Sequence, residues 1–292
     1  MKNKIVKVGL VQSSVGTDLK VNLNRTLKMV EDAAKKGAEI ICLQELYKTP
    51  YFPNQRGVKV ESYLETIPGE STLLFKNISK KHNCSIILPI YEKAKNGKLY
   101  NTVVVINEKG EIQPAYRKIH IPHDPSFYEK DYFEEGNNGY QLFKHKNIIY
   151  SVLICFDQWF PEAARMVKLS GAEMIFYPTA IGTIIGEKQI EGDWHDAWET
   201  VMRGHAIANS LPVVAVNRTG VEGKSKFWGQ SFVCDAFGKI LKRASEVKDE
   251  VIVVSIDLSM NDYISDSWGF LRNRRTDTYK LLIKKTKHVK KS

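Results

Sequence analysis

Apolar and polar residues follow two different periods along this chain, and the change from one to the other predicts strands and helices in turn. Residues 4–12 form an apolar-rich run that predicts a strand. From 21 to 36 the apolar residues recur at helical spacing and Gly37 follows, so an amphipathic helix is expected to end there. Residues 38–43 predict a short buried strand. The chain therefore begins with a β-α-β unit.

The same alternation continues through the rest of the chain. The run 148–155 is continuously apolar and β-branched, which predicts a central strand covered on both faces. A hairpin is predicted where 101–106 and 111–117 flank a turn at Lys109 and Gly110. The other predicted elements are helices at 71–82, 161–169 and 194–209 and strands at 84–91, 173–177, 212–217, 231–236 and 250–257.

No low-complexity linker or internal repeat divides the 292 residues, so the elements predict one α/β domain. Its strands are expected to form two sheets whose outer faces are covered by helices. We place this domain at 1–275 and a Lys-rich tail at 276–292.

Composition narrows the class of protein. Hydrophobic residues make up 43% of the chain and charged residues 26%, which excludes a disordered or collagen-like chain. No apolar stretch approaches the roughly 18 residues that a membrane-spanning helix needs, and the first ten residues carry no signal-peptide core. These features predict a cytoplasmic protein with no membrane partner.

The net charge of +10 raises a second possibility, because basic proteins often bind nucleic acid. Six lysines and no acid lie in 280–292, so most of the excess charge belongs to the tail. A solvated tail is the simpler interpretation, and nucleic acid is an unlikely partner. Salt-dependent binding that is lost on deleting 284–292 would support the alternative.

The four cysteines are far apart and form no CxxC pair, which disfavours a zinc knuckle and a disulfide framework. Cys42, Cys84 and Cys234 lie inside apolar runs and are predicted to be core residues. Cys155 differs, because it ends a predicted strand and a turn follows it.

Three titratable residues, Glu45, Lys118 and Cys155, lie at or just after the ends of predicted strands, where α/β proteins tend to place reactive groups. Each has an ordinary interpretation when taken alone: a solvated carboxylate, a surface amine and an inert core thiol. Together they supply an acid/base, a cation and a nucleophile, which are sufficient for acyl transfer.

A thiol attacks an amide carbon only as the thiolate, so Cys155 needs a base. Glu45, if enclosed by apolar groups, is expected to have a pKa raised by desolvation and to accept the thiol proton. Lys118 and the backbone N–H of Phe156 are then expected to stabilise the oxyanion.

Three segments carry these residues: 42–46 (CLQEL), 116–122 (YRKIHIP) and 154–165 (ICFDQWFPEAAR). In order and spacing they resemble the catalytic segments of the nitrilase superfamily of carbon–nitrogen hydrolases. The resemblance implies a four-layer α-β-β-α sandwich, no metal or other cofactor, and a homo-oligomer built from dimers. It makes Glu45 the general base, Lys118 the oxyanion stabiliser and Cys155 the nucleophile.

The resemblance also implies a second carboxylate. In the carbamoyl-hydrolysing branch a Glu-Lys pair precedes an aromatic pair, and Glu129-Lys130 before Tyr132-Phe133 matches this pattern. We expect Glu129 near Lys118 as an orienting or proton-handling group, with a solvated loop residue as the alternative.

Residues 158–165 followed by 176–182 are most similar to family members that hydrolyse N-carbamoylputrescine. The activity implied is cleavage of this compound to putrescine, carbon dioxide and ammonia, in polyamine synthesis from agmatine. The alternative within the same class is another N-carbamoyl compound, such as N-carbamoyl-β-alanine, or an aliphatic amide.

Residues around the nucleophile predict the charge of the substrate's far end. A carboxylate in a partly desolvated pocket needs a bidentate cation such as arginine, but Gln158 and Trp159 follow the nucleophile here. Trp159 and Tyr51 suit an alkyl chain or an ammonium group, so we predict a small cationic carbamoyl substrate. The acids expected to pair with its amine, or else to form a solvated loop, are Glu187, Glu191, Asp193 and Asp196.

Overall fold

The strands form two six-stranded sheets and one three-stranded sheet in the computed structural model, which describes residues 4–284. The first sheet has the order β15-β1-β2-β3-β4-β5, in which β1, β2 and β3 are parallel and the outer pairs are antiparallel. Its strands are β1 (Ile5–Gln12), β2 (Ile40–Leu43), β3 (Ser85–Lys93), β4 (Leu99–Ile106), β5 (Tyr116–Arg117) and β15 (Glu250–Asp257).

The second sheet has the order β14-β13-β10-β8-β7-β6, with β7, β8 and β10 parallel. Its strands are β6 (Leu142–His145), β7 (Ile148–Val152), β8 (Met174–Pro178), β10 (Val213–Val216), β13 (Phe232–Cys234) and β14 (Ile240–Arg243). The small sheet contains β9 (Gly182–Ile184), β11 (Thr219–Glu222) and β12 (Ser225–Trp228).

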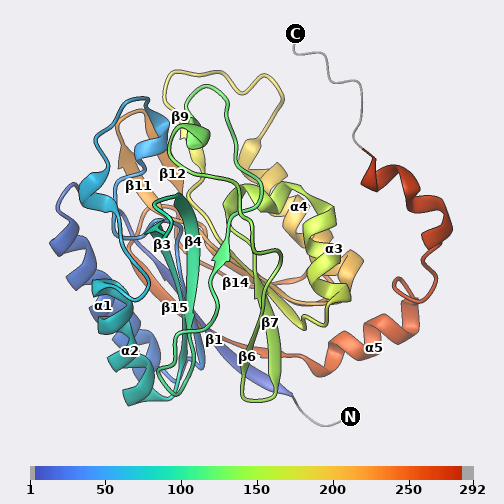
Figure 1. Cartoon of the computed structure of the whole chain (residues 1–292). Coiled ribbons are helices and arrows are strands. Elements are labelled where there is room, and N and C mark those ends of the chain that lie inside the picture. Colours follow the sequence, from blue (N-terminus) through green and yellow to red (C-terminus); the bar gives the residue numbers. More distant parts are fainter. Residues whose placement is uncertain (1–3, 285–292) are drawn as a thin grey trace.

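Two pairs of helices cover the outer faces of the large sheets, as Figure 1 shows. On the first sheet lie α1 (Leu19–Lys35) and α2 (Glu70–His82), and on the second lie α3 (Pro161–Leu169) and α4 (Trp194–Asn209). The inner faces of the sheets share one apolar core, and a second core lies under α1 and α2. This is the α-β-β-α sandwich that the sequence predicted.

Shorter elements complete the chain. Helix α5 (Ser259–Trp268) follows the last strand, and the short 3-10 helices are η1 (Phe52–Asn54), η2 (Glu61–Tyr63), η3 (Glu129–Asp131), η4 (Cys155–Trp159) and η5 (Thr276–Ile283).

Local sequence explains where the main helices begin and end. The Asp18 carboxylate accepts the backbone N–H groups of Lys20 and Val21 at the start of α1, which is a normal N-terminal cap. Gly37, with a φ of 86°, follows the end of that helix. Asp193 caps α4 in the same way.

Most predicted elements are confirmed, and the helices predicted at 161–169 and 194–209 match α3 and α4 at both ends. The hairpin arm predicted at 111–117 is wrong in extent, since only Tyr116–Arg117 and a bridge at Ile112 pair with β4. Pro114 interrupts this arm because it has no N–H to donate. The strand predicted at 148–155 ends at Val152, and Cys155 enters a turn.

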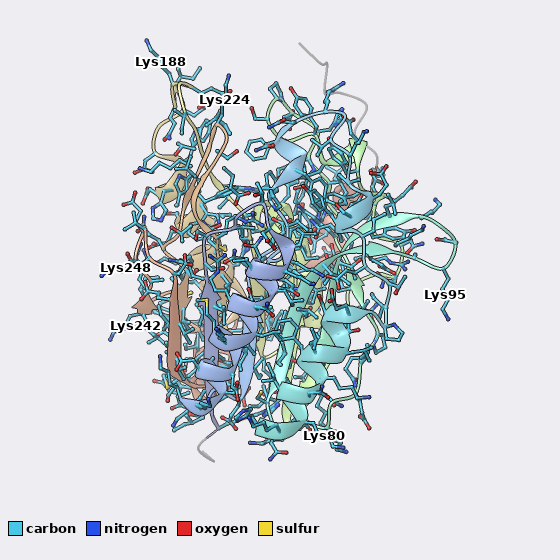
Figure 2. All side chains as sticks on the ribbon, turned by 90° about the vertical axis from the view of Figure 1, so that its left-hand side faces the viewer. Lys80, Lys95, Lys188, Lys224, Lys242 and Lys248 are labelled. Carbon is cyan, nitrogen blue, oxygen red and sulfur yellow. The ribbon has the colours of Figure 1, made fainter. Side chains whose placement is uncertain are left out.

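Basic side chains lie on more than one side of the described part of the chain. Of the six lysines labelled in Figure 2, which point outward, Lys188 and Lys224 lie at the top, Lys242 and Lys248 along one side, and Lys80 and Lys95 elsewhere. Residues 285–292, with four of the six tail lysines, lie outside the described residues, so the interpretation as a solvated tail, with nucleic-acid binding as the alternative, stays a prediction. Among residues 4–284, no helix has the length and apolar character needed to cross a membrane.

Candidate active site

Four of the predicted residues come together where strands of the two large sheets end. Glu45 follows β2, Lys118 follows β5, and Cys155 opens η4 just after β7, while Glu129 opens η3. The side chains of Glu45, Lys118 and Glu129 are at most 1% exposed, and Cys155 is 7% exposed. Burial of three charged side chains in one place requires that they satisfy one another.

The Lys118 ammonium lies between the two carboxylates. Lys118 Nζ donates to Glu45 Oε1 at 2.9 Å and to Glu129 Oε1 and Oε2 at 2.9 and 2.7 Å. Each carboxylate has one more donor: Asn101 Nδ2 lies 2.7 Å from Glu45 Oε1, and Tyr51 Oη lies 2.8 Å from Glu129 Oε1. The lysine is thus oriented by two buried acids that are themselves held in place.

Electrostatics in this cluster are those of two carboxylates around one ammonium. Burial alone would lower the pKa of Lys118, but Glu129 and Glu45 outweigh burial and raise it, so the lysine stays charged. Burial raises the pKa of Glu129 to about 7, with Glu45 adding to the rise and Lys118 opposing it. Glu129 can therefore gain or lose a proton near neutral pH.

Cys155 occupies a strained position at the sharp turn from β7 into η4. Its φ is 42°, in the left-handed region that residues with a side chain rarely adopt. Burial raises the pKa of its thiol, and the nearby Glu45 carboxylate raises it further, so the resting thiol is protonated. Glu45 Oε2 has no hydrogen-bond partner among residues 4–284 and can accept that proton.

Asp157 joins the segment that carries the cysteine to the segment that carries the lysine. Its buried carboxylate accepts the backbone N–H groups of Ile154 at 2.9 Å and His120 at 3.0 Å. It also accepts the Tyr116 hydroxyl at 2.7 Å, and His120 Nδ1 lies 2.7 Å away. Asp157 therefore fixes Lys118 relative to Cys155.

Arg218, which is fully buried, holds the turn that carries the first acid. Its guanidinium donates to the backbone carbonyls of Glu45 and Leu46, both at 2.9 Å. It also pairs with Glu222 at 2.6 Å, and Glu222 accepts the backbone N–H of Tyr51 at 2.6 Å. One charged pair thus positions both Glu45 and Tyr51.

A cavity of about 280 Å³ opens onto the thiol. Its walls are largely aromatic and apolar, and among residues 4–284 the only charged side chains that line it are Asp124 and Glu129. The lining residues are Tyr51, Pro122, Asp124, Phe127, Glu129, Cys155, Phe156, Trp159, Ala180, Ile181, Gly182, Trp194, Ala197 and Trp228.

The structure brings together most of the predicted site residues. Tyr51, Glu129, Cys155, Phe156 and Trp159 line the cavity, and Glu45 and Lys118 lie against Glu129 and the thiol. It does not bring in Glu187 and Glu191, two of the four acids predicted to pair with the substrate's amine.

Those two acids, Glu187 and Glu191, are exposed and do not line the cavity. Glu191 instead accepts the indole N–H of Trp194 at 3.1 Å, because it lies one turn away in the loop before α4. The interpretation as a solvated acidic loop fits both residues better.

Several residues of the site were not identified from the sequence as functional. Asn101 lies inside a predicted strand and Asp157 inside the nucleophile segment, where nothing in the apolar pattern separates them from their neighbours. Asp124 lies in a polar connection, and its only sequence signal is its closeness to Glu129. In residues 4–284, no three His, Cys, Asp or Glu side chains are grouped as metal ligands.

A comparison with protein-family models gives a match over most of the chain. Residues 7–262 match the carbon-nitrogen hydrolase family. The chain belongs to this family. Membership confirms the family and the enzyme class that the sequence motifs predicted.

Individual members of the carbon-nitrogen hydrolase family match nearly the whole chain. N-carbamoylputrescine amidase of Solanum lycopersicum is 38% identical over 97% of this chain and 96% of that protein. Citrullinase of Francisella tularensis is 35% identical over 96% of this chain and 99% of that protein. A similar fold is seen in the crystal structure of a carbon-nitrogen hydrolase from Helicobacter pylori G27, with a TM-score of 0.90. The two sequences are 37% identical, and the match covers 97% of this chain and 99% of that one.

Proposed function

We propose that this chain hydrolyses N-carbamoylputrescine to putrescine, carbon dioxide and ammonia, as a step of polyamine synthesis from agmatine. The relatives support cleavage of a carbamoyl group, since they include N-carbamoylputrescine amidases and a citrullinase. We place the reaction in the cytoplasm, where the four free cysteines stay reduced.

The residues that line the cavity are the main support for a substrate that ends in an ammonium group. Its walls offer aromatic and apolar surface and two acids, and within residues 4–284 no Lys, Arg or His lines it. A substrate that ends in a carboxylate would lose its hydration there without gaining a cationic partner. A butyl chain that ends in an ammonium group is compatible with aromatic walls and an acid.

The proposed reaction begins with proton transfer from the Cys155 thiol to Glu45. The thiolate attacks the carbamoyl carbon, and the carbonyl oxygen becomes an oxyanion that the Lys118 ammonium and the Phe156 backbone N–H stabilise. Glu45 then returns the proton to the departing nitrogen, the carbon–nitrogen bond breaks, and a thioester-like acyl-enzyme remains.

Water completes the reaction. Glu45 takes a proton from a water molecule, the resulting hydroxide attacks the acyl carbon, and the carbon–sulfur bond breaks with return of the proton to the sulfur. Loss of carbon dioxide from the carbamate balances the products as one putrescine, one ammonia and one carbon dioxide per water consumed. Glu129 orients Lys118 through this cycle and holds or releases a proton near neutral pH.

A panel assay of ammonia release tests the choice of substrate. We expect kcat/KM for N-carbamoylputrescine to exceed that for N-carbamoyl-β-alanine, citrulline and a simple aliphatic amide by more than about tenfold, because one charge-assisted contact is at stake. Comparable turnover of N-carbamoyl-β-alanine would overturn the proposed substrate and leave the roles of Glu45, Lys118 and Cys155 intact.

A further inference from the structure

One wall of the cavity is formed by the loop between β5 and η3. Pro122, Asp124 and Phe127 of this loop line the cavity, as does Glu129 at the start of η3. Glu129 is buried against Lys118, whereas Asp124 is exposed to solvent. The wall therefore runs from the reacting groups outward, with an acid at each end.

Backbone contacts hold Asp124 in place. Asp124 N donates to Phe127 O at 3.2 Å, and Phe127 N donates to Asp124 O at 2.8 Å, closing a tight turn. Ser126 in this turn has a φ of 65°. Tyr128 N donates to Pro53 O at 2.8 Å, which ties the turn to the segment after Tyr51. The aspartate is thus presented from a fixed backbone and not from a free loop.

The charge of Asp124 is not neutralised within the protein. Its carboxylate makes no hydrogen bond or ion pair with another residue of 4–284, whereas Glu129 is bound by Lys118 and Tyr51. The basic groups beside the turn, Arg56 and His123, face Asp131, at 3.6 and 3.8 Å.

The other acids expected to bind an amine have different roles or positions. Glu187 and Glu191 are outside the cavity lining, and Asp193 is engaged in capping α4. Asp196 is exposed on the first turn of α4 and does not line the cavity either. Of the acids near this site, Asp124 alone among the described residues combines a cavity-facing position with a carboxylate that has no partner.

We propose that Asp124 binds the terminal ammonium group of the substrate and so selects amine-ended carbamoyl compounds. This inference rests on the proposed function, because it assigns the recognition of the same substrate's far end. Aromatic side chains on the other walls, Trp159, Trp194 and Trp228, enclose the alkyl chain between the two ends. Amine recognition then depends on a single charge-assisted contact.

Kinetics of the Asp124→Asn variant test this assignment, with two substrates that differ only at the far end. N-Carbamoylputrescine carries the ammonium group, and N-butylurea has the same carbamoyl group and carbon chain without it. We expect kcat/KM for N-carbamoylputrescine to fall about ten- to a hundredfold, mainly through KM, and kcat/KM for N-butylurea to stay within about twofold.

Charge reversal sharpens the test. Asp124→Lys is expected to shift the preference toward 4-ureidobutyrate, whose carboxylate replaces the terminal methylene and ammonium group, by at least about tenfold relative to the wild-type protein. An equal loss on both substrates in Asp124→Asn would overturn the assignment, since it would indicate a structural role. A selective KM increase in Glu187→Gln or Glu191→Gln, with none in Asp124→Asn, would overturn it as well.

The same measurements distinguish a wrong substrate from a wrong assignment of Asp124. If the wild-type protein does not hydrolyse N-carbamoylputrescine, the substrate is wrong. If the wild-type protein hydrolyses it and Asp124→Asn is indistinguishable from wild type on both substrates, only the Asp124 assignment fails.

Discussion

Lys118 illustrates why this site is built from three charged residues and not two. One carboxylate would suffice to keep a buried ammonium charged, but it would then be fully engaged as a counter-ion. Here Glu129 contacts Lys118 through both oxygens, and Glu45 does so through one, which leaves Glu45 Oε2 unpaired. Because Glu129 provides most of the contact with Lys118, one oxygen of Glu45 stays available for proton transfer.

The raised pKa of Glu129 predicts how pH affects stability. The pKa is about 7 in the folded protein against 4.5 for an ordinary glutamate, so between these values the folded state holds a proton that the unfolded chain has released. This carboxyl makes the free energy of unfolding fall as pH rises through that range. Glu129→Gln removes the effect.

We therefore compare the unfolding free energy of Glu129→Gln with that of the wild-type protein at each pH. We expect the variant's value minus the wild-type value to increase by about 1–3 kcal/mol from about pH 5 to about pH 7.5. Denaturant titrations of both proteins at the two pH values measure this difference. The other titratable groups affect the variant and the wild-type protein equally, so their contributions cancel when the two free energies are subtracted. A relative stability that does not change with pH would contradict the assignment of the proton to Glu129.

At the scale of elements, the site depends on how two turns are joined. Cys155 and Lys118 follow strands of different sheets, and Asp157 bridges their segments through Ile154, His120 and Tyr116. The distance between nucleophile and cation is therefore set by a contact between loops, with the two sheets as rigid supports.

Asp157→Asn tests this bridge. The amide cannot accept all the donors that converge on the carboxylate, so we expect a loss of about 2–4 kcal/mol in unfolding free energy and a lower kcat with little change in KM. The unfolding free energy and kcat are both measured at a temperature at which the variant is folded in the absence of denaturant. Asp266→Asn, on the exposed face of α5, is the matched control and should match wild type. An unchanged kcat in folded Asp157→Asn would refute the positioning role.

Elements with a clear hydrophobic period were predictable, and those fixed by tertiary contacts were not. The helices α3 and α4 follow from the spacing of their apolar residues. Strands β9, β11 and β12 have three or four residues each, which is too short to display a period. The strand-end positions of Glu45 and Cys155 were readable, whereas the cavity-facing position of Asp124 depends on a turn that brings Phe127 back to it.

At the scale of the whole molecule, one group of exposed apolar side chains lies on the flank formed by α3 and α5. Met166 and Leu169 on α3 are 48% and 45% exposed, and Trp268 at the end of α5 is 58% exposed. Figure 1 shows α5 and the segment after it, in red, extending away from the sandwich on the side of α3. Large exposed apolar side chains on one flank are typical of an interaction surface.

We propose that a second copy of the chain covers this flank and so forms the homo-oligomer that the family resemblance implies. Light scattering at micromolar concentration is expected to give a multiple of the 33.3 kDa chain mass. Met166→Asp should increase the monomer fraction, while Leu73→Asp, on the exposed face of α2 at the opposite flank, should not. A monomeric mass for the wild-type protein would contradict the proposal.

Hydrolysis of N-carbamoylputrescine through Cys155 is tested most directly by quantifying the putrescine and ammonia that the wild-type protein and Cys155→Ser release. We predict one putrescine and one ammonia per substrate consumed, a rate lower by a factor on the order of a thousand or more in Cys155→Ser, and a near wild-type rate in the control Cys234→Ala. Absence of putrescine with the wild-type protein, or a comparable rate with Cys155→Ser, would contradict the claim.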